Sequence, residues 1–249
     1  MKKSFTIAID GPVAAGKGTI APELAKKIGG FYLYTGGTYR ALALMTIEEK
    51  IDADSMEEVI HLIQRANIGL EGKRVFLNGK DVTERIKEQD VASVVPTISS
   101  YKDVREAMTE KQRKIASDVA LRGQSTNFEH KDNGVRLPRQ KAVVAEGRDV
   151  ATVLFPDAEF KLFLTASTEV RARRRLEQFN ALGYENIAFE EVLDQIVKRD
   201  AKDVGRSNDP LIKEPEKHGY FVLDNSSLTE EETIEVIIKE LQRRGLLDD

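Results

Sequence analysis

The fold of this chain is decided by one stretch near its beginning, Thr6-Ile7-Ala8-Ile9-Asp10-Gly11-Pro12-Val13-Ala14-Ala15-Gly16-Lys17-Gly18-Thr19. Its apolar run predicts a short buried strand, and the small residues that follow predict a loop that leads into a helix. Gly11 and Gly16 let the backbone curl so that successive N–H groups point into one concavity, while the helix adds the positive end of its dipole. Because Lys17 adds a cation, the stretch predicts a phosphate-binding loop from Gly11 to Thr19.

The pattern of this loop narrows its chemistry. G-x-x-x-x-G-K fits the loop that binds nucleoside triphosphates, but Gly18 stands where a Ser or Thr usually follows the lysine, and the hydroxyl comes at Thr19. A glycine-rich turn with a surface lysine is the plainer interpretation, yet the strand and helix that the motif requires are both expected. A G-K-G-T ending resembles nucleoside monophosphate kinases more than GTPases or motor ATPases, which points to phosphoryl transfer between two nucleotides.

Composition limits the class of protein. With 249 residues, 41% of them hydrophobic, the chain can bury one sizeable core with a smaller appended lobe. Its 38 Lys and Arg against 42 Asp and Glu give a net charge of −4, so no global basic field is available to bind a nucleic acid polymer. The absence of cysteine excludes disulfides and thiolate zinc sites. Because the Met-Lys-Lys-Ser start runs directly into the first strand and no apolar run could span a bilayer, we expect a cytoplasmic protein without membrane contact. A monomer is the default expectation, which no feature of the sequence decides.

Apolar periodicity predicts that strands and helices alternate along the chain. Core strands are expected at 7–9, 31–34, 142–145, 160–164 and 220–223. Helices are expected between them, with N-terminal caps at Thr35, Ser55, Ser167 and Thr229. This alternation predicts an α/β fold with a parallel five-stranded sheet covered by helices, in which ligands bind beyond the carboxyl ends of the strands.

Two segments depart from this alternation. From Asn67 the period becomes alternating, and the turn signals Glu71-Gly72 and Asn78-Gly79 predict a small antiparallel meander in an inserted lobe. The stretch 122–141 is polar and predicts a mobile surface excursion. We therefore expect a single domain made of a core (about 1–35, 141–168 and 185–249), an acceptor-binding lobe (36–121), the polar insert (122–141) and a short arginine-rich lid (169–184).

A series of further motifs occurs in the order in which bacterial cytidylate kinases carry them. After the loop they are Thr35-Gly36-x-x-Tyr39-Arg40, Val104-Arg105 with Gln112-Arg113, Glu146-Gly147-Arg148-Asp149, Phe155-Pro156-Asp157-Ala158, Arg171-Ala172-x-Arg174-Arg175, and Arg199-Asp200-x-x-Asp203-x-x-Arg206 with Pro210-Leu211. The chain resembles this family over nearly its whole length except 122–141. The resemblance implies in-line transfer of a phosphoryl group from ATP to CMP or dCMP, with Mg²⁺ bound mainly to the ATP phosphates and helped by Thr19 through water.

The resemblance also implies roles for single residues. Phosphoryl transfer needs cations around the phosphate oxygens rather than a covalent nucleophile, and arginine binds phosphate with two parallel hydrogen bonds. The implied catalytic residues are Lys17, Arg148, Arg171 and Arg175. The implied acceptor-binding residues are Thr35, Arg40, Arg105, Arg148, Asp149, Arg199, Asp203 and Arg206.

The residue types agree with these roles, although each has a plainer alternative. The carboxylate of Asp149 can accept from the cytosine N4 amino group, where uracil offers an acceptor, and Arg105 can donate to O2 and N3; a surface salt bridge and a helix-end charge are the alternatives. Arg199, Asp203 and Arg206 lie on one face if their helix continues. Alone, that spacing would indicate a solvated ladder of ion pairs.

The arginine cluster of 171–175 admits two interpretations. It could be a nucleic-acid patch, but so few cations on an acidic protein yield few phosphate contacts. We favour a lid that brings Arg171 and Arg175 onto the donor phosphates and excludes water.

The chain departs from the family pattern at two positions besides the polar insert. Tyr34 stands where the family usually has Asp before the T/S-G pair, and Pro96 stands where a base-contacting serine is common. A kinase of UMP or another monophosphate, or a nucleotide-binding regulator with degraded catalysis, are therefore the alternative functions.

Overall fold

The computed structural model of the protein describes residues 4–122, 142–181, 183–184 and 187–248. The predicted polar insert therefore lies outside the described residues, apart from Arg122, which ends a helix. The strands are β1 (Phe5–Asp10), β2 (Phe31–Leu33), β3 (Ile68–Glu71), β4 (Arg74–Leu77), β5 (Lys80–Asp81), β6 (Ala142–Glu146), β7 (Phe160–Thr165) and β8 (Phe221–Asp224). The α-helices are α1 (Lys17–Ile28), α2 (Thr35–Glu48), α3 (Met56–Arg65), α4 (Gln89–Ile98), α5 (Lys102–Arg122), α6 (Thr168–Ala181), α7 (Phe189–Gly205) and α8 (Glu230–Arg243), with short helical turns η1 (Arg85–Lys87), η2 (Val150–Leu154) and η3 (Pro215–His218).

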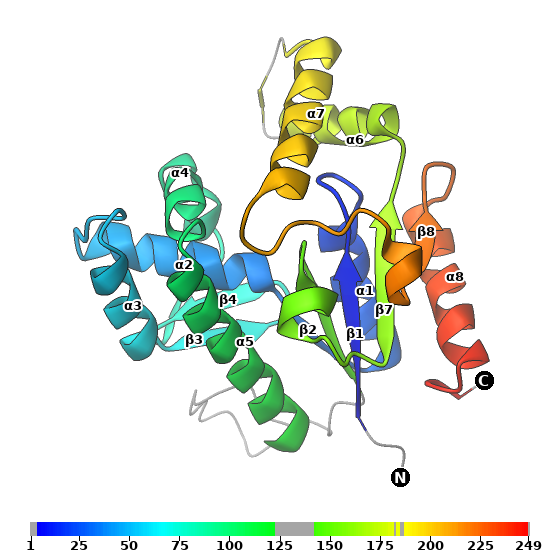
Figure 1. Ribbon diagram of the computed structural model, residues 1–249, viewed down its shortest axis with the longest axis horizontal. Helices are drawn as coiled ribbons and strands as arrows, with labels where there is room; N and C mark the ends of the chain where they lie inside the picture. The colour runs from blue at the N-terminus through cyan, green and yellow to red at the C-terminus, as the bar shows by residue number, and fades with distance from the viewer. Residues whose placement is uncertain (1–3, 123–141, 182, 185–186, 249) are drawn as a thin grey trace. The chain divides into compact units, whose positions relative to one another are not determined.

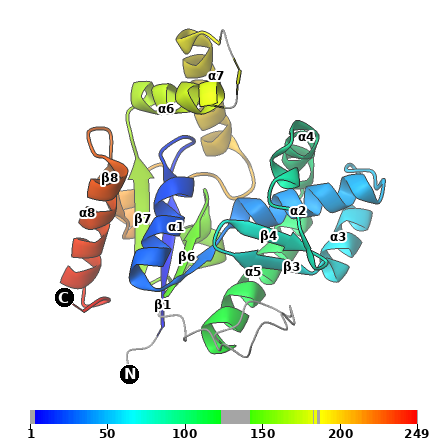
Figure 2. The same ribbon diagram turned by 180° about the vertical axis from the view of Figure 1, so that it is seen from behind.

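The main sheet has five strands in the order β2-β6-β1-β7-β8. The pairs β1–β7, β2–β6 and β7–β8 are parallel, with Ile9 opposite Leu162 and Leu164 opposite Leu223. Figure 1 shows β1 and β7 running side by side in one direction. Figure 2, seen from behind, shows α1 in front of these two strands and α8 next to β8. The parallel five-stranded sheet predicted from the sequence is confirmed.

The chain divides into two compact units. The loop unit consists of Phe5–Leu24 and Glu146–Asp249, and the meander unit consists of Met1–Ser4 and Ala25–Ala145. The proposed division into core, acceptor lobe and lid stays a prediction.

The meander unit contains the predicted antiparallel sheet of β3, β4 and β5. Ile68 faces Leu77 and Leu70 faces Val75 across the first pair, and all four side chains are buried. Asn78 and Gly79 connect β4 to β5 with positive φ at both residues, the conformation that an Asn-Gly hairpin turn requires. Gly72, between β3 and β4, also has a positive φ of 56°. The turns predicted at Glu71-Gly72 and at Asn78-Gly79 are therefore confirmed.

The loop unit joins the glycine-rich loop to the helices that follow β7. Ala172, Val192 and Ile196 form a buried apolar cluster between α6 and α7, and the partly buried Val13 and Ala14 of the loop pack against it. The helix that we predicted as a lid therefore contacts the loop through an apolar core.

Some local predictions differ from the structure. Thr35 is the first residue of α2, and Tyr34 precedes it as the N-cap without a side-chain hydrogen bond, so the predicted Thr35 cap is wrong. Ser55 is the N-cap of α3 but its side chain makes no capping bond. At α8 the predicted capping box is present, with Thr229 and Glu232 bonding each other's backbone. Helix α4, which contains Pro96 in its last turn, was not predicted.

Candidate functional site

The loop between β1 and α1 has the curled backbone that its glycines predict. Gly11 has φ +149° and Gly16 has φ +92°, and a Cβ at Gly11 would lie 2.0 Å from the Leu164 carbonyl oxygen. Ala14 also has a positive φ of 59°, which is strained for a residue with a side chain. Residue 11 can therefore only be glycine, for conformational and steric reasons together.

Lys17 bends back into this loop. Its Nζ donates to the carbonyl oxygens of Gly11 and Pro12, both at 2.7 Å, and the residue is buried. Burial lowers the pKa of Lys17 to about 7; the nearby charge of Arg148 lowers it too, while the Glu146 carboxylate opposes the shift. The ammonium group is thus held inside the curve of the loop, where a phosphate would favour its charged form.

A cluster of arginines surrounds Asp203 on α7. Arg148 donates from Nε to Asp203 Oδ2 at 2.8 Å and from Nη1 to the Gly147 carbonyl at 3.3 Å, while Arg199 Nε lies 3.2 Å from Asp203 Oδ1. Burial acts to raise the pKa of Asp203, but Arg148, Arg199 and Arg206 outweigh it and the pKa falls below its ordinary value. The structure therefore brings together four of the predicted acceptor-binding residues.

The expected helical face of these residues is only partly right. α7 ends at Gly205, and Arg206 follows with an extended backbone, φ −65° and ψ 145°. Arg199 and Asp203 do share a helix face, but Arg206 reaches the electrostatic neighbourhood of Asp203 from the connection after the helix. The chain turns there because the Leu211 N–H donates to the Asp203 carbonyl at 2.9 Å.

Arg171 donates to four protein groups. It donates to the Ala166 carbonyl at 2.9 Å, to the Val13 carbonyl at 3.2 Å and to Asp200 Oδ2 at 2.7 Å. A further bond at 3.2 Å reaches Thr168 Oγ1, and the Arg171 side chain is only 6% exposed. This geometry ties the loop to α6 and α7.

The second arginine predicted for the lid lies differently. Arg175 donates to Gln178 Oε1 at 3.2 Å, and its guanidinium carbon lies 4.5 Å from the centre of the Phe179 ring. The residue is exposed on α6. The donor-phosphate role of Arg171 and Arg175 stays a prediction.

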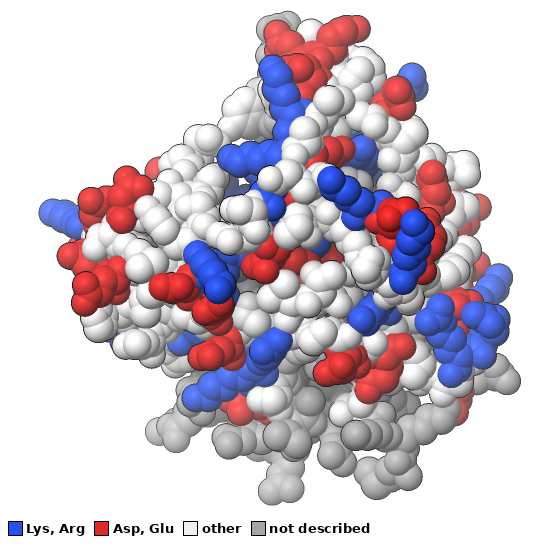
Figure 3. Space-filling view, viewed as in Figure 1, with Lys and Arg blue, Asp and Glu red and all other residues white. Residues whose placement is uncertain are grey.

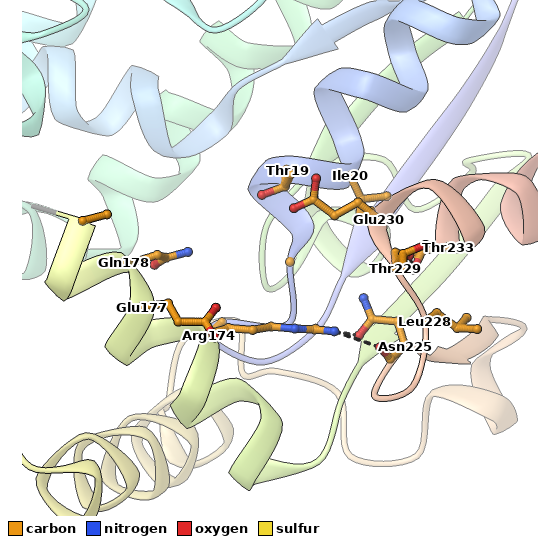
Figure 4. Close-up of a pocket in the computed structure, with 13 residues that line it drawn as sticks. Thr19, Ile20, Arg174, Glu177, Gln178, Asn225, Leu228, Thr229, Glu230 and Thr233 are labelled. Carbon is orange, nitrogen blue, oxygen red and sulfur yellow. Dashed lines mark hydrogen bonds between the residues drawn. The ribbon is translucent and has the colours of Figure 1, made fainter.

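A pocket of about 450 Å³ opens beside the loop. Figure 4 shows Arg174 extending from α6 toward Asn225, with Thr19 of α1 and Glu230 of α8 among the other lining residues. Arg174 donates to the Asn225 side-chain oxygen at 2.9 Å and to its carbonyl at 2.8 Å. In turn Asn225 Nδ2 donates to the Ala15 carbonyl at 3.2 Å.

Sequence reasoning missed this pocket. Arg174 was visible only as a member of the arginine cluster, and Asn225 was not singled out. The position of Asn225 directly after β8 was a usable signal, because ligand sites in parallel sheets lie beyond the carboxyl ends of strands.

The meander unit holds three more of the predicted acceptor-binding residues, Thr35, Arg40 and Arg105. Arg40 donates from Nη1 to the Ile86 carbonyl at 3.0 Å, and Arg105 is buried on α5. Gln112, also on α5, donates to Thr38 Oγ1 at 2.8 Å, and Thr38 donates to the Thr35 carbonyl at 2.7 Å. This chain of bonds holds the first turn of α2.

Tyr34, the departure from the family pattern, packs at the same turn. Its ring stacks on Tyr32 with centroids 5.8 Å apart and planes at 16°. A Cβ at Gly37 would lie 2.4 Å from the Tyr34 ring, so glycine there leaves the space that the ring occupies. The aromatic ring therefore replaces a carboxylate with an apolar contact at the start of α2.

The rest of the described chain offers few other sites. In residues 4–122 and the described parts of 142–248, no group of three or more His, Asp or Glu could hold a metal ion. No helix of these same parts is long and apolar enough to cross a membrane. Figure 3 shows acidic and basic side chains interspersed over the visible surface.

Comparison with known proteins matches the chain to cytidylate kinases. The family model described as cytidylate kinase matches residues 7–124 and 127–243. The chain is 41% identical to a cytidylate kinase of Caldanaerobacter subterraneus subsp. tengcongensis over 237 residues, 95% of this chain and 94% of that protein. It is 32% identical to a cytidylate kinase of Bacillus subtilis over 249 residues, 98% of this chain and 100% of that protein.

Solved structures support the fold alone. A crystal structure of an uncharacterized protein from Eubacterium ventriosum has 14% sequence identity and a TM-score of 0.50, covering 97% of this chain and 99% of that one.

Proposed function

Because the chain belongs to the cytidylate kinase family, we propose that it transfers the γ-phosphoryl group of ATP to CMP or dCMP, giving ADP and CDP or dCDP. The observation that carries this proposal is the gathering, within the loop unit, of the Lys17 loop and the arginines around Asp203. A phosphate-binding loop alone would fit many nucleotide-binding proteins. The second cluster of cations supplies a site for a second phosphate.

The loop and the neighbouring pocket would bind ATP. The N–H groups of Gly11–Thr19 and the ammonium of Lys17 would hold the phosphates, as in other loops that precede a helix. The pocket beside Gly16 and Thr19 is large enough for a purine ring, and the guanidinium of Arg174, held flat by Asn225, offers a surface on which the ring can stack.

Mg²⁺ would enter with ATP rather than occupy a protein cage. The donor set fits this arrangement, because Thr19 carries the one side-chain hydroxyl of the loop Gly11–Thr19 and lines the pocket. Magnesium commonly keeps several waters and binds through substrate phosphates. Bound there, it would neutralise charge on the transferring phosphoryl group, and Thr19 would hold one of its waters.

The acceptor phosphate would bind the arginines around Asp203. Arg148 and Arg199 are both oriented by the Asp203 carboxylate, and Arg148 keeps a 21% exposed side chain that can reach a ligand. Asp149 would accept from the cytosine amino group. Thr35, Arg40 and Arg105 of the meander unit stay predicted acceptor-binding residues.

These residues would act by positioning and charge. The transferring phosphoryl group spreads negative charge over its equatorial oxygens, and the attacking and leaving oxygens lie in line. Lys17 and Arg148 would stabilise that charge, and Arg171 and Arg175 stay predicted ligands of the donor phosphates. Monomeric state, cytoplasmic location and the lack of a polymer partner also stay predictions.

The test is a coupled assay of ADP release with ATP and each of CMP, dCMP, UMP and AMP. We expect release with CMP or dCMP, and its loss in the Lys17→Ala variant, which removes the loop cation. Release with UMP alone would reassign the enzyme to another monophosphate. ATP binding without release for any acceptor would instead indicate a nucleotide-binding regulator.

A further inference from the structure

The carboxylate of Asp10 is buried directly before the phosphate loop and has no part in the reaction proposed above. It ends β1 and is 0% exposed. Its Oδ1 accepts from the Val150 N–H at 2.7 Å, and its Oδ2 accepts from the Ala151 N–H at 2.9 Å and from the Tyr220 hydroxyl at 2.8 Å. Burying a carboxylate without such donors would be very costly, so these three bonds determine where the group can lie.

The same end of β1 holds the preceding segment by a second bond. The Gly147 N–H donates to the Ile9 carbonyl at 2.9 Å. The segment Gly147–Ala151 is therefore hydrogen-bonded to β1 at both of its ends, to Ile9 at its start and to Asp10 at its end. Only Arg148 and Asp149 lie between the two attachments, and these are the residues that we place at the acceptor phosphate and the base.

Tyr220 completes the arrangement from the other side. It is buried, its N–H donates to the Pro215 carbonyl at 3.2 Å, and its ring meets Phe163 edge to face at 84°. These contacts aim its hydroxyl at Asp10. In the Tyr220→Phe variant the ring would keep its place, but the Asp10 carboxylate would lose one of its three donors.

We propose that Asp10 and Tyr220 are positioning residues for the acceptor nucleotide, which hold the segment Gly147–Ala151 so that Arg148 and Asp149 face CMP. The proposal rests on the proposed function, since it assigns these two residues to acceptor binding. The ionised carboxylate accepts all three bonds at once, whereas a proton on Oδ2 would take one of the two acceptor positions that the Ala151 N–H and the Tyr220 hydroxyl use.

The ionisation of Asp10, and with it this set of bonds, depends on pH. Burial raises the pKa of Asp10, while the bonds from Ala151, Val150 and Tyr220 and the charge of Lys17 lower it. Asp149 is a further charged group that acts on Tyr220, whose pKa is raised by burial and by Asp10. Glu146, Arg148 and Asp203 act on Lys17 and so surround the same end of β1 with charge. Removing the Tyr220 hydroxyl removes a lowering contribution, so protonation of Asp10 then occurs at higher pH.

The experiment compares Tyr220→Phe and Asp10→Asn in the full chain, with Thr46→Val as the control. Thr46 also buries a hydroxyl that donates to a carbonyl, at 2.9 Å, but it lies on α2 in the meander unit and has no bond to this segment among those described. We expect kcat/KM for CMP to fall about tenfold in Tyr220→Phe and about 100-fold in Asp10→Asn, since misplacement by about 1 Å can cost that much. In Tyr220→Phe the KM for ATP should stay close to that of the wild type.

Two further readouts separate positioning from general stability. The acid limb of the pH profile of kcat/KM for CMP should move to higher pH in Tyr220→Phe relative to the wild type. Amide hydrogen exchange at Val150 and Ala151 should quicken in Asp10→Asn, because the amide NH₂ cannot accept from the second N–H. Thr46→Val should change neither.

The outcomes divide clearly. Equal losses for CMP and ATP, or a pH profile that Tyr220→Phe leaves unmoved, would overturn the positioning role. Slow exchange at Val150 and Ala151 in Asp10→Asn would overturn the anchor itself. If the wild type phosphorylated only UMP, the proposed function would fail while faster exchange in Asp10→Asn still supported the anchor.

Discussion

Arg171 and Arg148 each bind a carboxylate of α7, and these two carboxylates lie one helical turn apart. The two arginine side chains differ in how much of each is exposed to solvent. Arg171 binds Asp200, and its side chain is 6% exposed because it also bonds the backbone of the loop and of the β7–α6 connection. Arg148 binds Asp203, and its side chain is 21% exposed. The comparison teaches that the same kind of ion pair can leave an arginine in two different states: Arg171 is enclosed by protein groups, and Arg148 keeps exposed surface for the ligand that we propose.

The largest effect that would test this comparison is the loss of Arg148. We expect Arg148→Ala to lower kcat/KM for CMP about 1000-fold, or about 4 kcal/mol, because it removes a cation from the transferring phosphate. Steady-state kinetics with CMP as the varied substrate measures this. Arg173→Ala is a matched control, since Arg173 is exposed on α6. An Arg148→Ala enzyme with near wild-type turnover would contradict the ligand role.

The next effect is on stability and belongs to Arg171. We expect Arg171→Ala to lower the free energy of unfolding by about 3 kcal/mol, because it leaves Asp200 and two backbone carbonyls without their donor. Urea unfolding measures the change, and Arg173→Ala should stay within about 0.5 kcal/mol of the wild type. Unchanged stability together with a collapsed transfer rate would make Arg171 a phosphate ligand instead of a tether.

A third arginine sharpens the contrast. Arg174 lies one helical turn after Arg171 but bonds Asn225 at the pocket. We expect Arg174→Ala to raise the KM for ATP about tenfold through the loss of a stacking surface worth about 1–2 kcal/mol, with little change for CMP. Kinetics with each substrate varied in turn tests this, and a selective change in the KM for CMP would refute the assignment.

The smallest expected effect is a pH dependence at Lys17. Its pKa of about 7 lies below the ordinary 10.5, mainly because the residue is buried. Between these two pH values the folded protein binds fewer protons than the unfolded chain. The free-energy cost of burying Lys17 therefore falls as the pH rises. ATP favours the charged form, so its affinity should fall about fivefold from pH 7 to pH 8, with proton uptake.

Calorimetry at pH 8 in two buffers of different ionisation enthalpy measures that proton uptake. Arg148→Ala should reduce it, since the charge of Arg148 helps to lower the pKa of Lys17. Arg171→Ala should leave it unchanged. Equal uptake in all three proteins would show that Arg148 does not act on the loop lysine.

Much of the fold was predictable from the sequence because its signals are local and periodic. The strand–loop–helix at the start, the meander with its Asn-Gly turn, and the Thr229 capping box depend on residues close in sequence. The caps at Thr35 and Ser55 failed because a cap depends on backbone angles that the residue type alone does not determine.

The site was predictable only where its residues belong to recognisable motifs. Arg148, Arg199 and Asp203 meet as expected. Asp10 with Tyr220 and Arg174 with Asn225 are separated by 210 and 51 positions, and no periodicity links residues so distant in sequence. The tether role of Arg171 was hidden for the same reason, since its partner Val13 lies 158 positions away.

The central claim is that the arginines around Asp203 bind CMP while the loop binds ATP. Its most direct test is the thermal stabilisation of Arg148→Ala by CMP and, separately, by ATP. A ligand at 100 times its dissociation constant stabilises the folded state by about 2.7 kcal/mol, so loss of binding is visible as a lost shift in melting temperature. The account predicts that CMP no longer raises the melting temperature of this variant while ATP still does. A CMP shift equal to that of the wild type would contradict it.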